Sequence, residues 1–238
     1  MPVYTFDPVL PSGRRNYWGY AENNFYFALN ASYCATDDPV TEFRNMLRAF
    51  HRAGIACILE FHIPDSAALS IVSDALRFWA FGIGADGFHL TGNPVTIDEI
   101  LRDPCLSDRM LLLNSAHQAV SPKQCFMPYG HIYVMQQEFR SSARRVLIGD
   151  AGATASFTEW SRCCPAQYHA VNSIADHNGF TLLDLVSYNE KHNEENGEGN
   201  RDGAYDNESW NCGEEGPADS PAVRSLRKRQ MRNAVMMV

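Results

Sequence analysis

The stretch DGFHLTG at residues 86–92 brings a histidine and a threonine together at the end of an apolar run. His89 and Thr91 are two residues apart, so their side chains point to the same face of a strand. A threonine hydroxyl is a poor nucleophile unless a base activates it. A Thr–His couple is therefore one chemistry that this strand end could support. A strand end without chemistry is the alternative.

The segments around this stretch alternate between helix and strand patterns, and they determine where the two side chains lie. Residues 41–53 place apolar side chains on one helical face, and Gly54 ends that helix before the apolar run IACILEF. Further strands are expected at 86–90, 109–114 and 169–175, and further helices at 66–81, 96–103, 139–148, 180–188 and 220–238. This alternation favours an α/β fold with a parallel sheet and crossover helices.

Two of the expected helices have recognisable starts. Thr96 is the expected N-cap of one, with Glu99 at capping-box spacing, and Ser220 followed by Pro221 starts the last helix. A basic cluster in that last helix is interpreted as its solvated face; it consists of Arg224, Arg227, Lys228, Arg229 and Arg232. Only about four good strands are recognisable, whereas a closed (β/α) barrel needs eight. The sequence therefore resembles the middle of a larger domain.

Two long stretches, residues 11–40 and 188–220, lack a regular pattern. The second is polar, acidic and rich in glycine, a composition typical of a disordered linker. Against that, it carries Tyr188, Tyr205 and Trp210, and loops this long within a domain are usually functional or disordered. Its acidic residues superficially suggest calcium, but the ladder of an EF-hand loop is missing, so no metal site is expected.

Composition limits the classes of function. The formal net charge is −8, which argues against nucleic acid or an anionic membrane surface as the main partner. The N-terminal residues do not resemble a signal peptide, and no apolar run approaches the ~20 residues of a spanning helix. The seven cysteines form no CxxC pair and no Cys/His metal spacing. A reduced, cytoplasmic protein without cofactor is the simplest interpretation.

Several motifs occur in the order seen in one enzyme family. They are NYWGY at 16–20, EFRNMLRAFHRAGIACIL at 42–59, LRDPCLSDRMLLL at 101–113 and, most specifically, the region 177–217 that begins HNGFTLLDLVSYNEKHNEENGEGNRDG. Together they resemble the α-amylase superfamily (glycoside hydrolase family 13), in its isoamylase and glycogen-debranching branch. The resemblance covers nearly the whole chain. It implies one partial (β/α)8 TIM-barrel domain over residues 1–238, from about the end of the second barrel strand to the seventh helix.

The family's catalytic positions can be carried over residue by residue. Retaining glycosidases need a nucleophilic carboxylate and a carboxylic acid about 5–5.5 Å apart. The resemblance places the nucleophile position at Thr91 and its arginine position at His89. It places the acid position at Asn114 and the carboxylate after the seventh strand at Asn178. None of these residues is a carboxylate, so the resemblance implies a catalytic set that is not retained.

Other carboxylates are candidates to replace the missing catalytic groups. On the family's third strand the expected Asp and Asn-His become Glu60 and Pro64-Asp65, and Asp150 follows the helix expected at 139–148. Losing a catalytic set that acts as a unit typically costs about 10⁶ in rate, which changes elsewhere rarely restore.

Two residues match the family's sugar-binding positions. Tyr20 corresponds to a tyrosine that stacks on the sugar at the cleavage subsite, and His177 to a histidine that hydrogen-bonds it. The structural alternatives are a loop aromatic packed on the barrel rim for Tyr20 and a satisfied histidine at a helix start for His177. Trp18 and Trp210 are interpreted as packing residues.

Three readings of function follow. The chain is a catalytically silent relative of debranching enzymes that binds an α-glucan such as glycogen or starch. Alternatively, it is an active α-1,6-glucan hydrolase with displaced catalytic groups, or a fragment without independent function. An unclosed barrel would expose sheet edges, which predicts aggregation or a partner chain that completes the barrel.

Overall fold

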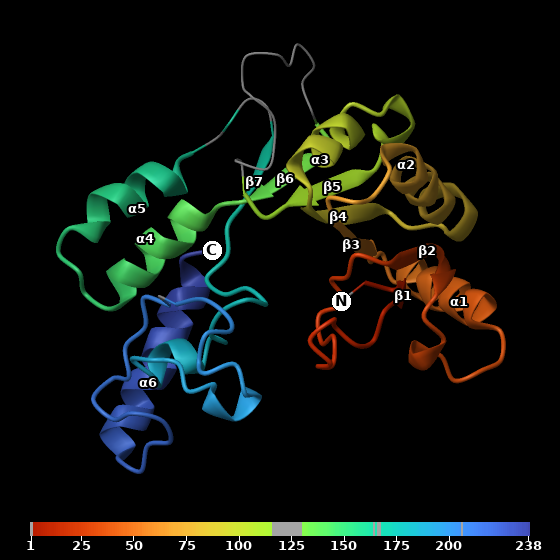
Figure 1. The fold of residues 1–238 in the computed structure, drawn as a ribbon. Helices are drawn as coiled ribbons and strands as arrows, with labels where there is room; N and C mark the ends of the chain where they lie inside the picture. Colours follow the sequence, from red (N-terminus) through yellow and green to blue (C-terminus); the bar gives the residue numbers. More distant parts are fainter. Residues whose placement is uncertain (1, 116–129, 164, 166–167, 206) are drawn as a thin grey trace. The chain divides into compact units, whose positions relative to one another are not determined.

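The computed structural model divides the chain into two compact units (Figure 1). The N-terminal unit comprises residues 1–135 with 165–169, and the C-terminal unit comprises 136–164 with 170–238. Each unit has its own hydrophobic core. The part of the chain that the model describes consists of residues 2–115, 130–163, 165, 168–205 and 207–238. That residues 1–238 act as one barrel-type domain stays a prediction.

The strands confirm the α/β class expected from the sequence. A parallel sheet has the order β3-β4-β5-β6-β7, and a short antiparallel pair, β1-β2, precedes it (Figure 1). The strands are β1 (Tyr4–Phe6), β2 (Asn24–Leu29), β3 (Ile58–Ile63), β4 (Gly87–Gly92), β5 (Met110–Leu113), β6 (Ile132–Met135) and β7 (His169–Val171). The strand periodicity missed β2 and β6; β2 lies within the irregular stretch 11–40, and β6 has only four residues.

Side-chain alternation gives the parallel sheet two different faces. Along β3 the odd residues Leu59, Phe61 and Ile63 are buried, and the residues between them are half-buried. The odd residues belong to the core, together with the apolar side chains of α2 and α3. The half-buried face carries polar residues, and it holds the candidate site.

One glycine shows how closely β3 and β4 approach. A Cβ atom on Gly92 would lie 2.0 Å from the carbonyl oxygen of Ile63, and the residue has a φ of +101°. Only glycine tolerates both conditions. The pairing of the two strands ends at this Ile63–Gly92 contact, which places Thr91 at the carboxyl edge of the sheet.

The helices of the N-terminal unit follow the apolar patterns of the sequence, with one correction at a helix start. They are α1 (Pro39–Arg52), α2 (Leu69–Arg77), which continues as a π-helical turn over Phe78–Ile83, and α3 (Pro94–Leu101); short 3-10 turns occur at Ala31–Tyr33 and Pro104–Leu106. The predicted N-cap Thr96 of the third helix was wrong. The cap is Asn93, whose side chain accepts from the amides of Val95 and Thr96, because Pro94 fits the first helical position.

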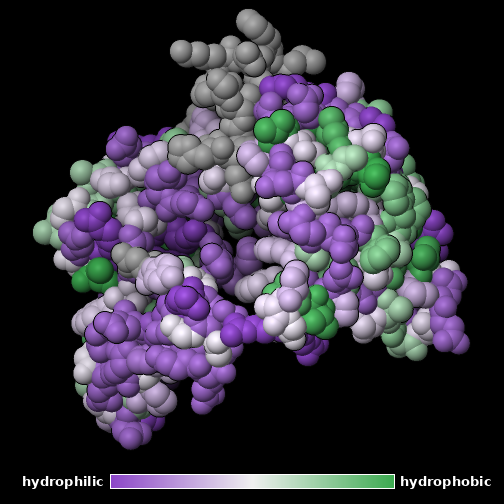
Figure 2. Space-filling view, viewed as in Figure 1, coloured by the Kyte–Doolittle hydropathy of each residue, from purple (hydrophilic) through white to green (hydrophobic). Residues whose placement is uncertain are grey.

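The C-terminal unit is helical and irregular. Helix α4 (Gln137–Leu147) packs against α5 (Ala153–Ser161) and α6 (Pro221–Met236), around a core that includes Phe139, Leu185 and Ala234. The sequence did not predict α5. The helix expected over 180–188 is reduced to a 3-10 turn at Asp184–Val186, and a second such turn lies at Glu194–Asn196. Figure 2 shows mainly hydrophilic residues over α6 and the loops before it.

Candidate functional site

A polar cluster lies on the half-buried face of β3 and β4 and at the end of β5. Parallel pairing sets Glu60 beside His89 and His62 beside Thr91, and Asn114 directly follows β5. In (β/α) folds the carboxyl ends of strands carry the chemistry of the site. The sheet therefore gathers the predicted residues His89, Thr91 and Asn114 at that edge.

The hydrogen bonds in this cluster differ from the predicted Thr–His couple. The hydroxyl of Thr91 lies 3.2 Å from Nδ1 of His62, on the neighbouring strand. His89 instead pairs with Asn114, with 2.8 Å between Nε2 and Oδ1. His62 was not among the residues that the sequence analysis assigned to a site. Period-two spacing from Glu60 on the same strand was the available signal for placing His62 on the site face.

The electrostatics of the His62–Thr91 pair favour hydrogen bonding over nucleophilic attack. Burial lowers the pKa of His62, which keeps the imidazole neutral at physiological pH. A neutral imidazole can accept a proton from a hydroxyl. Thr91, however, is only 6% exposed, so little of it is accessible to a substrate. The pair is arranged to orient polar atoms at the strand ends.

Tyr20 joins this cluster through both its ring and its hydroxyl. The ring stacks on His62, with centroids 4.6 Å apart and an interplanar angle of 18°, and Trp18 stacks at 6.4 Å and 26°. The phenol donates a hydrogen bond to Glu60. Burial and this hydrogen bond raise the pKa of Tyr20, so the hydroxyl stays protonated. Trp18, predicted to be a packing residue, is 38% exposed beside Tyr20 and extends the aromatic surface.

The three candidate rescue carboxylates occupy different surroundings. Glu60 contacts the site through Tyr20. Asp65 accepts a hydrogen bond from the side chain of Asn93, with 2.8 Å between the two atoms. Asp150 lies in the C-terminal unit and pairs with Arg145 at 2.6 Å. Glu60 is thus the member of this set that the fold brings to the strand-end cluster.

His177 and Asn178 lie in the C-terminal unit, and both side chains are exposed. The backbone amide of Asn178 donates to Asp176, 3.1 Å away, and Asp176 pairs with Arg140. Asn178 lines an open pocket of about 300 Å³ that is formed by residues between positions 178 and 207. His177 and Asn178 therefore belong to a second polar region, which lies in the C-terminal unit.

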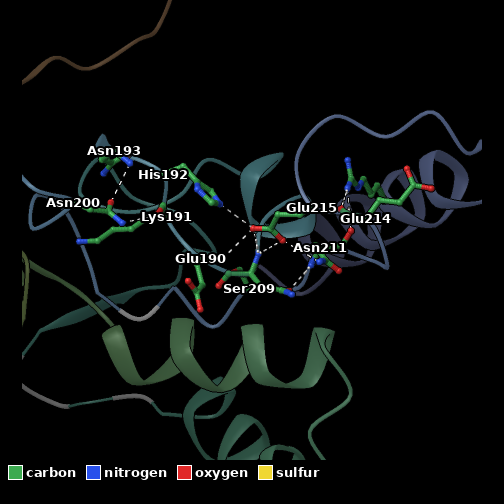
Figure 3. Close-up of polar contacts among 11 residues, drawn as sticks. Glu190, Lys191, His192, Asn193, Asn200, Ser209, Asn211, Glu214 and Glu215 are labelled. Carbon is green, nitrogen blue, oxygen red and sulfur yellow. Dashed lines mark hydrogen bonds and ion pairs between the residues drawn. The ribbon is translucent and has the colours of Figure 1, made fainter. Parts of the chain in front are cut away.

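The segment 188–220 is organised by hydrogen bonds around Glu215 (Figure 3). The carboxylate accepts from the backbone amide of Asn189 at 3.0 Å, from the side chain of Asn211 at 3.0 Å and from Nε2 of His192 at 3.2 Å. Composition pointed to a disordered linker or a functional loop. The pairing of one carboxylate with donors up to 26 residues away shows an ordered loop.

The basic cluster of α6 is not entirely a solvated face, and that prediction was wrong for Arg227. This residue is 6% exposed and donates to the carbonyls of Gly216, Asn211 and Glu214. Helical periodicity turns position 227 inward, toward the loop that precedes the helix. A buried guanidinium is stable here because it satisfies several carbonyl acceptors at once.

Replacing Glu215 by glutamine is expected to remove the acid sensitivity of this loop. Partial burial alone would raise the pKa of Glu215, but the amides of Asn189 and Glu190 and the side chains of Asn211 and His192 lower it to about 2. A depressed pKa contributes stability that is present above the unfolded value of about 4.3 and is lost as pH falls toward 2. We expect the protection factors of the amides of residues 189–192, which correct for the intrinsic pH dependence of exchange, to fall over that window in the wild type.

The E215Q variant should show lower protection factors in this loop at neutral pH and little further fall between pH 5 and 2. Glu194→Gln, an exposed carboxylate in the same loop, is the matched control and should follow the wild type. Equal pH profiles for wild type and E215Q would contradict the role of Glu215.

Two kinds of feature are absent from the described ranges. No three histidine, cysteine, aspartate or glutamate side chains there are grouped in a way that could hold a metal ion. No helix in that part of the chain combines the length and apolar character needed to cross a membrane.

Comparison with known proteins relates this fold to one group of enzymes. No family model matches the chain. It is 31% identical to a glycogen operon protein GlgX homolog of Mycobacterium tuberculosis, over 100% of this chain and 43% of that protein. It is 26% identical to isoamylase SU1 of Zea mays, described as chloroplastic, over 98% of this chain and 41% of that protein. The chain thus spans less than half the length of these relatives.

Alignment with the GlgX homolog extends over 314 positions, whereas the chain has 238 residues. That relative therefore carries additional residues inside the matched region.

Two solved structures share the fold. A pullulanase from Anoxybacillus, complexed with maltotriose, has a TM-score of 0.56 and 17% identity, over 77% of this chain and 37% of that one. AmyP in complex with maltose has a TM-score of 0.57 and 10% identity, over 99% and 67%. The chain is therefore a homologue of the GlgX and isoamylase proteins, in the debranching branch of glycoside hydrolase family 13, and it carries part of a (β/α) barrel of their kind.

Proposed function

We propose that this protein binds α-glucan without hydrolysing it. The observation that carries the proposal is the pairing at the strand ends: His62 with Thr91, and His89 with Asn114. Of these side chains, Thr91 and Asn114 occupy the positions at which the family resemblance implies a nucleophile and an acid. A hydroxyl and an amide cannot replace two carboxyl groups, because the leaving oxygen needs a proton and the oxocarbenium centre needs a negative charge.

Sugar recognition requires less than catalysis does. Aromatic rings and hydrogen-bond donors hold a pyranose without supplying protons. The phenol of Tyr20 stays protonated and donates a hydrogen bond to Glu60. Trp18 lies partly exposed beside Tyr20. Solved structures of the same fold were determined with maltotriose or maltose bound to those proteins. We propose that Tyr20 and His177 contact a bound α-glucan in this protein.

The proposal also includes the cellular compartment of the protein and a partner chain. The five cysteines in the described part of the chain are free thiols, which is consistent with a reducing compartment such as the cytoplasm. In the sheet order β3 is an edge strand, so a partner chain that completes the barrel would pair there.

Native gel electrophoresis with glycogen cast into the gel tests the binding function. The wild type should migrate as a sharp band that glycogen retards, and Tyr20→Ala should lose most of that retardation. Tyr33→Ala removes another half-exposed tyrosine and is the matched control. A sharp wild-type band that glycogen does not retard would refute the proposal. A smear retained at the well would support the alternative that the chain is a fragment without independent function.

Reducing-sugar release from glycogen tests the alternative of an active hydrolase. We expect no release above the buffer rate, since loss of the catalytic set costs about 10⁶ in rate. Glu60 is the carboxylate that favours the alternative, because it hydrogen-bonds Tyr20 at the strand ends. Measurable release of reducing sugar that disappears in Glu60→Gln would show that Glu60 replaces the missing catalytic carboxylates. It would overturn the proposal that the protein binds α-glucan without hydrolysing it.

A further inference from the structure

The exposed side of α6 carries a concentration of positive charge. The helix has five basic residues and no acidic residue over Pro221–Met236. Arg227 is turned inward, and the other four are exposed and form the basic face of the helix: Arg224, Lys228, Arg229 and Arg232. Arg224 donates to the carbonyl of Asp219 at 2.6 Å, and none of the four belongs to an ion pair within the described ranges.

Helical spacing aligns three of these charges. Arg224, Lys228 and Arg232 follow one another at four-residue intervals, and residues four apart are neighbours on one side of a helix. The row therefore extends over about 12 Å, at a rise of about 1.5 Å per residue. On the opposite side, Arg227 fixes the helix to the preceding loop through the carbonyl of Gly216 at 2.7 Å. The basic face thus lies on an anchored helix.

The same unit carries a set of exposed carboxylates, which form an acidic turn: Glu190, Glu194 and Glu195. None of these three carboxylates belongs to an ion pair within the part of the chain that the model describes. The backbone of the turn is ordered, because the amide of Asn193 donates to the side chain of Asn200 at 3.0 Å (Figure 3). Charges on an ordered backbone lose little conformational entropy when they bind a partner.

The basic face and the acidic turn are complementary in charge, yet they do not pair with each other within one chain. Both lie in the C-terminal unit, so this observation does not depend on the N-terminal unit. Nucleic acid fits the basic face less well, because its line of phosphates would continue past the helix and meet the acidic loop 188–220. We propose that the basic face of α6 docks the acidic turn of a second copy of this chain.

Distance decides between this attraction and the repulsion of two chains that each carry a net charge of −8. At 0.1 M ionic strength the Debye length is about 10 Å, so charges spread over the rest of the surface are largely screened, whereas charges in contact are not. Exposed ion pairs are individually weak, so the contact needs several of them and depends on salt. It joins different surfaces of the two copies, and each copy therefore keeps one set free for a further neighbour.

Sedimentation velocity of the full chain, over a range of protein concentrations, tests the contact. The average mass should rise with concentration in about 0.1 M NaCl and stay that of one chain in about 1 M NaCl, where the Debye length is about 3 Å. Lys228→Gln combined with Arg232→Gln should weaken the association about tenfold. Arg48→Gln combined with Arg52→Gln removes two exposed arginines at the same spacing from α1 and should associate like the wild type.

Mixing two variants distinguishes this contact from other kinds of self-association. One variant carries Lys228→Gln and Arg232→Gln, the other Glu190→Gln and Glu194→Gln, and each alone should sediment as a monomer. Their mixture should form a dimer that grows no further, because one intact acidic turn meets one intact basic face.

Three results would overturn the docking proposal: a mixture that stays monomeric, association of the wild type that persists in about 1 M NaCl, or a monomeric wild type that binds single-stranded DNA through Lys228. The last result would favour nucleic acid as the partner of the basic face. The samples contain no glycogen, so each outcome is independent of the proposed function.

Discussion

Replacing Arg227 by methionine is expected to lower the free energy of unfolding of the C-terminal unit by about 2–4 kcal/mol. The guanidinium is buried and donates to the carbonyl of Gly216 at 2.7 Å, and to those of Asn211 and Glu214. Methionine has a similar length but no donor, so buried carbonyls would lose a charged partner. Urea unfolding followed by circular dichroism measures the change.

The matched control for Arg227 lies on the same helix. Arg229 is exposed, and Arg229→Met should change the free energy of unfolding by less than about 0.5 kcal/mol. Hydrogen exchange should then locate the R227M effect in residues 211–217, before α6. Equal effects of the two substitutions would mean that the buried guanidinium adds no more stability than a surface arginine.

Trp79→Ala is expected to cost about 3–5 kcal/mol of unfolding free energy in the N-terminal unit. Trp79 is 1% exposed, packs edge-on against Phe43 with centroids 5.9 Å apart, and donates from Nε1 to the carbonyl of Tyr26 at 2.6 Å. Alanine would leave a cavity and an unpaired carbonyl. Thermal and urea unfolding of the purified variant give the magnitude.

Phe81 is the aromatic control in the same π-helical turn. It is 57% exposed, with the Arg109 guanidinium 5.1 Å from its ring centroid, so Phe81→Ala should cost about 1 kcal/mol or less. A Trp79→Ala variant as stable as Phe81→Ala would contradict the assignment of Trp79 to the core.

The strand-end pairs suggest why hydrolysis and binding can be separated in one fold. Two carboxyl groups kept together in a half-buried site repel each other and lose hydration. The His62–Thr91 and His89–Asn114 pairs contain no carboxyl group. Under the proposed function, the scaffold avoids the electrostatic cost of a catalytic set, and its aromatic residues bind sugar.

Much of the N-terminal unit could be predicted from local patterns. Apolar spacing predicted α1, α2 and the strands β3, β4 and β5, because each shows a helical apolar face or a continuous apolar run. Strand β6 was missed, although it has four residues as β5 does. The Thr96 cap failed for a related reason: two potential caps lay three residues apart, and the position of Pro94 decided between them.

The sequence by itself determined the family, the α/β class and the residues at the strand ends, because these depend on residue order and on short-range spacing. It could not determine which histidine pairs with Thr91. That depends on the register between β3 and β4, which places His62 beside Thr91 and leaves His89 to Asn114. Only the tertiary structure showed that Glu215 and Arg227 order the acidic loop, because their partners lie up to 26 residues away. Composition describes how a segment interacts with water, whereas order here arises from a few long-range donors and acceptors that only the folded chain brings together.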